Sequence, residues 1–309
     1  MSDRPTAGPT PPKPEPSDAA AGPASAESEA GNAGGAAVTA VAPARRTGPA
    51  LLGLSQGGME IRQFLRSREQ VTFTLAFPAI LILVFGSIFK GTIGDGVKFT
   101  QYFVTGMIGT GLMTAGFQAL AIQIPMERDR GVLKRFLGTP MPKWVYFAGK
   151  VLMVMFIALL ETVILLTVAT LLFGLKMPDT GAKWLTFLWV SVLGITACTL
   201  CGVAFSSLAR TGRSAPAVVT PVALVLQFIS GVFFLFTSLP GWMQNVASIF
   251  PLKWMCQGLR AVFLPASFGA REPGGAYDLP MVALVLGVWC VVAFALCLTT
   301  FRWTTKRDG

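Results

Sequence analysis

Long apolar runs separated by short polar stretches dominate the chain from residue 72 to residue 301. A helix that crosses a bilayer core of about 30 Å needs about 20 residues, because each residue adds about 1.5 Å. Six runs approach or exceed that length, at residues 72–89, 102–124, 145–173, 184–209, 217–239 and 280–301. The pattern predicts an all-α membrane protein with six transmembrane helices.

The stretch before the first span, residues 54–70, has a different pattern. Leu54, Ile61 and Leu65 fall near one side of a helix, and three arginines take the other side. This arrangement is typical of a basic amphipathic helix that lies on an anionic membrane surface. We therefore predict an N-terminal amphipathic interfacial helix here.

The connection between the fifth and sixth spans, residues 240–265, is largely apolar but is divided by Pro251. Each half is too short to cross a bilayer, and Pro251 is suited to the first position of a helix. We predict two short re-entrant helices covered by neighbouring protein. Lys253 and Arg260 would then lie at headgroup level.

The densest charge in the body of the chain lies between the second and third spans, at residues 125–144. Apolar residues within it share one face of a short helix, at Val132, Leu133, Phe136 and Leu137. Such a helix between two spans can bury its apolar side only in the lipid boundary or against a partner protein. The composition also fits a charged loop that only fixes topology, and both interpretations stay open at this point.

Positive charge is divided unequally between the two ends of the predicted spans. The end that carries the 54–70 helix, the 125–150 loop, the 210–213 loop and the C-terminal tail has 14 Lys and Arg residues, and the opposite end has 7. The positive-inside bias then places both termini in the cytoplasm.

Composition supports a membrane protein, since 53% of the residues are hydrophobic and only 13% are charged, against about 25% charged in soluble domains. The net charge of +10 is explained by basic residues at membrane edges, so we expect membrane lipid and no nucleic acid as a partner. Residues 1–50 are rich in Pro, Ala, Gly and Ser and contain no aromatic residue. They predict a disordered cytoplasmic tail before a transmembrane domain at residues 51–309.

The residues offer little catalytic chemistry. The chain has no histidine, which removes imidazole metal ligands and histidine-based triads. Cys198 and Cys201 are expected to pack inside an apolar helix rather than to bind metal. No phosphate loop of the G-x-x-x-x-G-K-[ST] type occurs. We therefore expect no catalytic residue, no metal and no cofactor in this chain.

Two predicted spans carry stripes of aromatic, methionine and polar residues. These candidate substrate-pathway residues are Phe103, Met107, Thr110, Thr114 and Phe117 in the second span, and Thr220, Gln227 and Phe234 in the fifth. Such stripes suit a cavity for large amphipathic ligands. They suit helix–helix packing equally well.

Glu161 is the one acid deep inside an apolar run. A charge at that depth costs about 2.5–3.5 kcal/mol on insertion scales. We therefore expect the carboxyl group to be protonated, hydrogen-bonded to a neighbouring helix or in contact with water. A functional role and a structural hydrogen bond are both open.

The 127–140 segment, ERDRGVLKRFLGTP, resembles the loop between the second and third spans of ABC type 2 permeases, the transmembrane subunits of ATP-binding-cassette exporters. The resemblance covers about residues 55–309. It implies that the loop helix is a coupling helix that docks on a separate cytoplasmic ATPase subunit. The residues assigned to docking are Glu127, Arg128, Arg130, Gly131, Leu133, Lys134, Arg135, Leu137 and Pro140.

The resemblance also implies a function. ATP and Mg²⁺ would bind the partner subunit, and two permease chains, identical or different, would pair in a bacterial plasma membrane and move cargo outward by alternating access. The stripes favour a small amphipathic, drug-like cargo, and a lipid or lipid-linked polysaccharide is the alternative. A proton-coupled carrier that uses Glu161 and a membrane scaffold without transport are competing classes.

Overall fold

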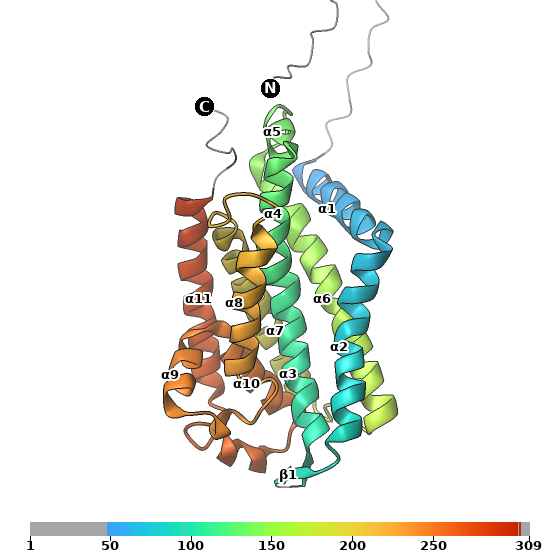
Figure 1. Ribbon diagram of the computed structural model, residues 1–309, viewed down its shortest axis with the longest axis vertical. Helices are drawn as coiled ribbons and strands as arrows, with labels where there is room; N and C mark the ends of the chain where they lie inside the picture. The colour runs from blue at the N-terminus through green and yellow to red at the C-terminus, as the bar shows by residue number, and fades with distance from the viewer. Residues whose placement is uncertain (1–47, 95, 302, 304–309) are drawn as a thin grey trace, which may run out of the picture. The chain divides into compact units, whose positions relative to one another are not determined.

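The computed structural model describes residues 48–94, 96–301 and 303. Its α-helices (Figure 1) are α1 (Pro49–Arg66), α2 (Arg68–Ile88), α3 (Phe99–Met113), α4 (Ala119–Asp129), α5 (Val132–Leu137), α6 (Lys143–Phe173), α7 (Gly181–Phe205), α8 (Ala215–Ile229), α9 (Gly241–Ile249), α10 (Pro251–Phe263) and α11 (Leu279–Thr300). The other elements are the π-helical turn η1 (Thr114–Gln118), the 3-10 turns η2 (Phe236–Ser238) and η3 (Ala266–Arg271), and the antiparallel strands β1 (Thr92–Gly94) and β2 (Val97–Lys98). The predicted tail, apart from residues 48–50, lies outside the described residues, as do Arg302, Lys306 and Arg307.

By length and composition, five helices in the described part of the chain can cross a membrane. They are α2, the continuous helix Phe99–Asp129 made of α3, η1 and α4, and the helices α6, α7 and α11. The protein is therefore an all-α membrane protein, as predicted. The remaining candidate, α8, has only 15 residues, so six crossings stay a prediction.

The fifth apolar run does not form one helix over residues 217–239, because α8 ends at Ile229. The chain then turns through Gly231, whose φ of 74° is a conformation that glycine adopts without strain. The Gly231 carbonyl accepts hydrogen bonds from the Tyr102 hydroxyl at 2.9 Å and from Nη1 of Arg260 at 3.5 Å. Irregular backbone at membrane depth is tolerated where protein groups satisfy it, and these two side chains satisfy it here.

The 240–265 segment folds as α9 and α10, and Pro251 is the first residue of α10. α10 packs against α3, α7 and α11, and most of its residues are buried. The divided segment is therefore covered by protein on several sides.

The two cations of α10 are buried among protein groups, and their depth in the membrane stays a prediction. Lys253 and Arg260 are 2% and 0% exposed. Arg260 forms two hydrogen bonds with Glu272, one of them from Nη2 at 3.1 Å. Lys253 donates to Gln257 at 2.6 Å. The acid that pairs with Arg260 comes from the segment after α10, a pairing that the local sequence pattern did not predict.

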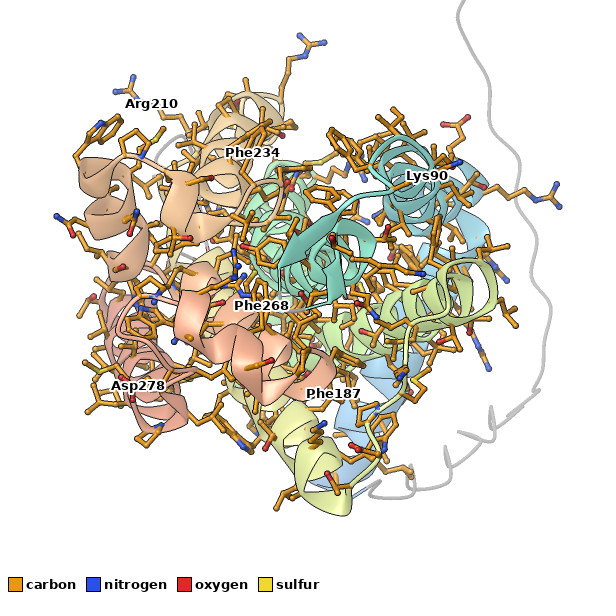
Figure 2. All side chains as sticks on the ribbon, turned by 90° about the horizontal axis from the view of Figure 1, so that it is seen from below. Lys90, Phe187, Arg210, Phe234, Phe268 and Asp278 are labelled. Carbon is orange, nitrogen blue, oxygen red and sulfur yellow. The ribbon has the colours of Figure 1, made fainter. Side chains whose placement is uncertain are left out.

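The segments that connect the helices cover the end of the bundle that faces the viewer in Figure 2. Phe268 of η3 lies near the middle of this end, and its ring packs against Tyr102 with 5.9 Å between centroids (Figure 2). Val97, Tyr102, Leu264 and Phe268 form a small buried cluster there.

At the opposite end, α1 lies along the first part of α6 (Figure 1). Glycines allow the close approach: a Cβ atom on Gly57 would lie 2.6 Å from Leu152, and one on Gly149 would lie 2.5 Å from Gln56. The predicted interfacial helix therefore packs on protein along one side. It begins at Pro49 rather than at residue 54.

The turn η1 marks the place where the Phe99–Asp129 helix packs on α7. A Cβ atom on Gly202 of α7 would lie 2.7 Å from the carbonyl oxygen of Phe117. The two helices therefore touch backbone to backbone beside a π-helical turn, a feature that recurs at functional sites.

Candidate functional site

The short helix α5 projects from the end of the bundle, between α4 and α6 (Figure 1). Gly131, with φ of 72°, makes the left-handed turn that leads from α4 into it. Val132 and Leu137 are 41% and 39% exposed, and Arg130 and Arg135 are exposed near them. Exposed apolar and cationic side chains together suit contact with a partner that offers acidic and apolar groups.

The opposite side of α5 is attached to the rest of the protein. Leu133 is 1% exposed. The Phe136 ring packs edge-on against Tyr146 of α6, with 5.8 Å between centroids. Trp303 stacks on Phe136 and contacts Phe147. α5 is therefore held to the start of α6 by an aromatic cluster.

Beneath this cluster lies a buried network centred on Lys150 of α6. Its ammonium group donates to Glu60 of α1 at 2.9 Å and to Glu127 of α4. The Tyr146 hydroxyl donates to the other oxygen of Glu127 at 2.7 Å. The side chains of Lys150, Glu60 and Glu127 are 1%, 7% and 11% exposed. One cation thus joins three helices.

Further hydrogen bonds hold the edges of this network. Gln56 and Gln123 donate to the two carboxylate oxygens of Glu60 at 3.3 Å and 3.4 Å. Arg128 donates from Nη1 to the backbone carbonyl of Ser206, the residue that follows α7, at 3.4 Å. Buried charges need this kind of satisfaction, since an unpaired charge is strongly destabilising. The base of α5 is therefore connected to α1, α6 and α7.

The structure separates the nine docking residues predicted from the sequence into two groups. The exposed ones are Arg130, Lys134, Arg135, Leu137 and Pro140, Gly131 is partly exposed, and the buried ones are Glu127, Arg128 and Leu133. In this conformation Glu127 and Arg128 contact the chain's own helices and not a surface that a partner could reach. These contacts hold α4 in place, and a docking role for Glu127 and Arg128 stays a prediction.

Sequence reasoning missed Glu60 and Lys150. A signal was present, because Lys150 lies inside the α6 apolar run and a cation there requires an acid partner. Glu60 lies on α1, among residues that otherwise suit a membrane surface. Periodicity alone could not show that these two side chains meet.

The two polar stripes differ in their burial within this chain. Phe103, Met107 and Thr110 are buried in a helix that packs against α2, α6, α7 and α10. On the other stripe Thr220 and Phe234 are exposed. Within one chain, helix packing explains the buried part of the second-span stripe, including Phe103, whose ring stacks on Phe85 at 4.8 Å.

Of the remaining three stripe residues, two are partly exposed and one lines a cavity. Thr114 and Gln227 are partly exposed. Phe117 lines a cavity of about 480 Å³ that is bordered by α7, α8 and α11. The cavity walls are mostly apolar and include Phe205, Leu226 and Trp289.

Glu161 lies on α6 beside α3 and is 2% exposed. Its Oε1 atom occupies the space that a side chain on Gly111 would need, because a Cβ atom there would lie 2.6 Å away. Its Oε2 atom has no hydrogen-bond partner among the residues that the structure describes. The predicted hydrogen bond between helices is therefore not formed by Oε2.

A sequence comparison decides the family. A family model described as ABC-2 type transporter matches residues 58–264, which extend from α1 to the end of α10. The chain belongs to the ABC-2 type transporter family. The resemblance noted in the 127–140 segment is thereby confirmed, and the protein is a membrane permease subunit of an ABC transporter.

Individual relatives agree with this membership. The ABC-2 type chain is 27% identical over 252 residues to the inner membrane transport permease YadH of Escherichia coli (strain K12), a match that covers 77% of this chain and 90% of YadH. It is 22% identical over 165 residues to the probable multidrug ABC transporter permease YbhR of the same organism, covering 53% of this chain and 44% of YbhR.

Proposed function

We propose that this ABC-2 type permease exports a small amphipathic compound across a bacterial inner membrane, driven by a separate ATPase subunit that docks on α5. Exposed Val132, Leu137 and Arg135 on α5 support a docking surface. The inner membrane location and a drug-like cargo are supported by the descriptions of the relatives YadH and YbhR. ATP and Mg²⁺ belong to the partner subunit in this proposal.

The observation that carries the proposal is the buried connection behind α5. A surface that receives force is useful only if that force reaches the spans, and an exposed loop on a flexible tether would lose it. Here α5 is packed on Tyr146, and α4 is tied through Glu127 and Lys150 to α6 and α1. A displacement of α5 therefore moves two spans and the interfacial helix together.

We further propose that two permease chains pair and that cargo passes between them. The exposed stripe residues of the α8 region, Thr220 and Phe234, would then face the path. In this arrangement α8 and the turn after it form the fifth of six crossings, which places both termini in the cytoplasm. A proton-coupled carrier is less well supported, because no ionisable side chain in the described structure is hydrogen-bonded to Glu161.

Charge reversal on α5 tests the docking step. The double variant Arg130→Glu/Arg135→Glu should lower co-purification of the ATPase subunit by at least tenfold, because repulsion replaces attraction. ATP-dependent uptake of a fluorescent cationic dye into inside-out vesicles should fall in parallel.

The matched control is Arg62→Glu/Arg66→Glu, two exposed arginines on α1. It should leave ATPase binding intact. The docking proposal fails if the α5 variant binds the ATPase and transports dye as the parent does. The exporter proposal fails if the purified permease transports dye without any ATPase.

A further inference from the structure

The cavity bordered by α7, α8 and α11 has the length of one membrane leaflet. Its α11 lining extends from Trp289 to Thr300, which is about 16 Å at the helical rise of about 1.5 Å per residue. The hydrocarbon core of a bilayer is about 30 Å thick. The cavity volume of about 480 Å³ lies within the usual range for small-molecule sites, about 300–1,000 Å³.

The cavity is closed at one end and open at its side. The corner between α9 and α10 closes it, with Phe250, Pro251 and Leu252 in the wall. Val222 of α8 and Leu296 of α11 line the cavity and are still 36% and 43% exposed. They form the two rims of an opening between α8 and α11. At this depth the surrounding medium is hydrocarbon, so an acyl chain is the most abundant species that can enter an apolar cavity from the side.

The other end of the cavity meets a basic loop. Ser207 and Leu208 line the cavity, and the loop from there to α8 carries Arg210 and Arg213, both exposed. Figure 2 shows Arg210 at the periphery of the molecule. Neither arginine forms an ion pair with a residue that the structure describes. Arginine is well suited to phosphate, because its planar group can donate two parallel hydrogen bonds.

The loop is also fixed in place. The backbone N–H of Gly212 donates to the Asp129 carboxylate of α4. A Cβ atom on Gly212 would lie 2.6 Å from the backbone of Met126, so the loop is packed tightly against α4. The two arginines are therefore presented by an attached segment beside the mouth of the cavity.

We propose that this cavity is a binding site for an anionic phospholipid, with one acyl chain between α7, α8 and α11 and the phosphate at Arg210 and Arg213. The lipid is a resident ligand and not the transported cargo. Leaflet-length depth, an apolar wall, a side opening and a basic mouth occur together here, and an anionic phospholipid satisfies all four. Its headgroup lies beside the end of α4, so the inner-leaflet lipid is placed to stabilise the segment that leads into α5.

Photochemical labelling of the full-length protein tests the site. The protein is placed in phosphatidylcholine vesicles with a trace of phosphatidylglycerol or phosphatidylcholine that carries a diazirine on one acyl chain. We expect the phosphatidylglycerol probe to label peptides from 198–208 and 289–300 preferentially. Arg210→Gln/Arg213→Gln should reduce that preference about thirtyfold, since each basic residue near the surface contributes about a fivefold gain for an anionic lipid.

Two further variants separate the headgroup from the chain. Leu226→Trp, which places a larger side chain in the cavity wall, should abolish the preferential labelling of both peptides by the phosphatidylglycerol probe and leave the background labelling of the lipid-facing side of α11. Arg62→Gln/Arg66→Gln, a surface pair away from the cavity, should change nothing. The proposal is overturned if the two probes label the cavity equally, if labelling lies elsewhere, or if the transported dye displaces the probe, which would make the cavity a cargo site.

Discussion

Replacing Lys150 by methionine should destabilise the protein strongly, because it leaves two carboxylates without their cation. The side chains of Glu60 and Glu127 are only 7% and 11% exposed, so water cannot take the place of the lost ammonium group. Removal of one partner from a buried ion pair costs about 3–5 kcal/mol. Tyr146 and Gln56 still donate to these carboxylates, which places the expected cost toward the lower end.

The assay is thermal unfolding of the purified protein in detergent, followed by size-exclusion chromatography. A change of 1 kcal/mol shifts Tm by about 2–4 °C in proteins of about 150–250 residues, so a cost of about 3 kcal/mol should lower Tm by roughly 6–12 °C. The matched control is Lys183→Met, which removes an exposed pair with Asp179 and should leave Tm close to that of the parent.

A second variant identifies the cause. In Lys150→Met/Glu60→Gln/Glu127→Gln all three charges are removed, and the amides keep hydrogen-bonding capacity. Replacing a whole buried ion pair by neutral groups is often nearly neutral for stability, so most of the lost Tm should return. The reasoning is refuted if Lys150→Met melts with the Lys183→Met control, or if the triple variant is no more stable than Lys150→Met.

Two other predictions concern close helix contacts. Gly202→Ala would place a methyl group 2.7 Å from the Phe117 carbonyl oxygen and should destabilise the protein by about 1–3 kcal/mol. The control Gly287→Ala meets nothing within 4 Å and should be neutral or stabilise the protein by up to about 1 kcal/mol. Equal melting temperatures of the two variants would contradict the close contact at Gly202. Gly111→Ala should also lower Tm, and adding Glu161→Ala should restore part of the lost Tm. The coupling energy between the two substitutions should be about 0.5–3 kcal/mol in a double-mutant cycle. Strictly additive effects would show that the two side chains do not compete for space.

The sequence predicted most helices because run length alone identifies a membrane-crossing segment. The first, third and sixth apolar runs correspond to α2, α6 and α11. The predicted end of the fifth helix was wrong. Gly231 is held out of the helix by hydrogen bonds from Tyr102, a residue 129 positions earlier, and from Arg260. Hydrogen bonds between residues so far apart in the sequence cannot be predicted from local periodicity.

The docking residues show the same limit. Apolar periodicity in the 125–144 segment predicted a short helix between two spans, and the structure has α5 there. Charge density along the sequence could not distinguish Arg135, which is exposed, from Glu127, whose partner Lys150 lies on another helix. That distinction depends on which cation pairs with which acid in the folded protein.

The continuous helix Phe99–Asp129 can be considered as a lever. Tyr102, near one end, holds the turn after α8, and Glu127, near the other, belongs to the Lys150 network. Contact with Gly202 at η1 supplies a fulcrum, with Gly116 about 21 Å from Tyr102 and about 17 Å from Glu127 along the axis. Because the two arms are nearly equal, a tilt about this point moves the two ends in opposite directions by similar distances. A push received at α5 would then arrive at the far side of the membrane reversed in direction and, because the arm to Tyr102 is the longer one, slightly larger in amplitude.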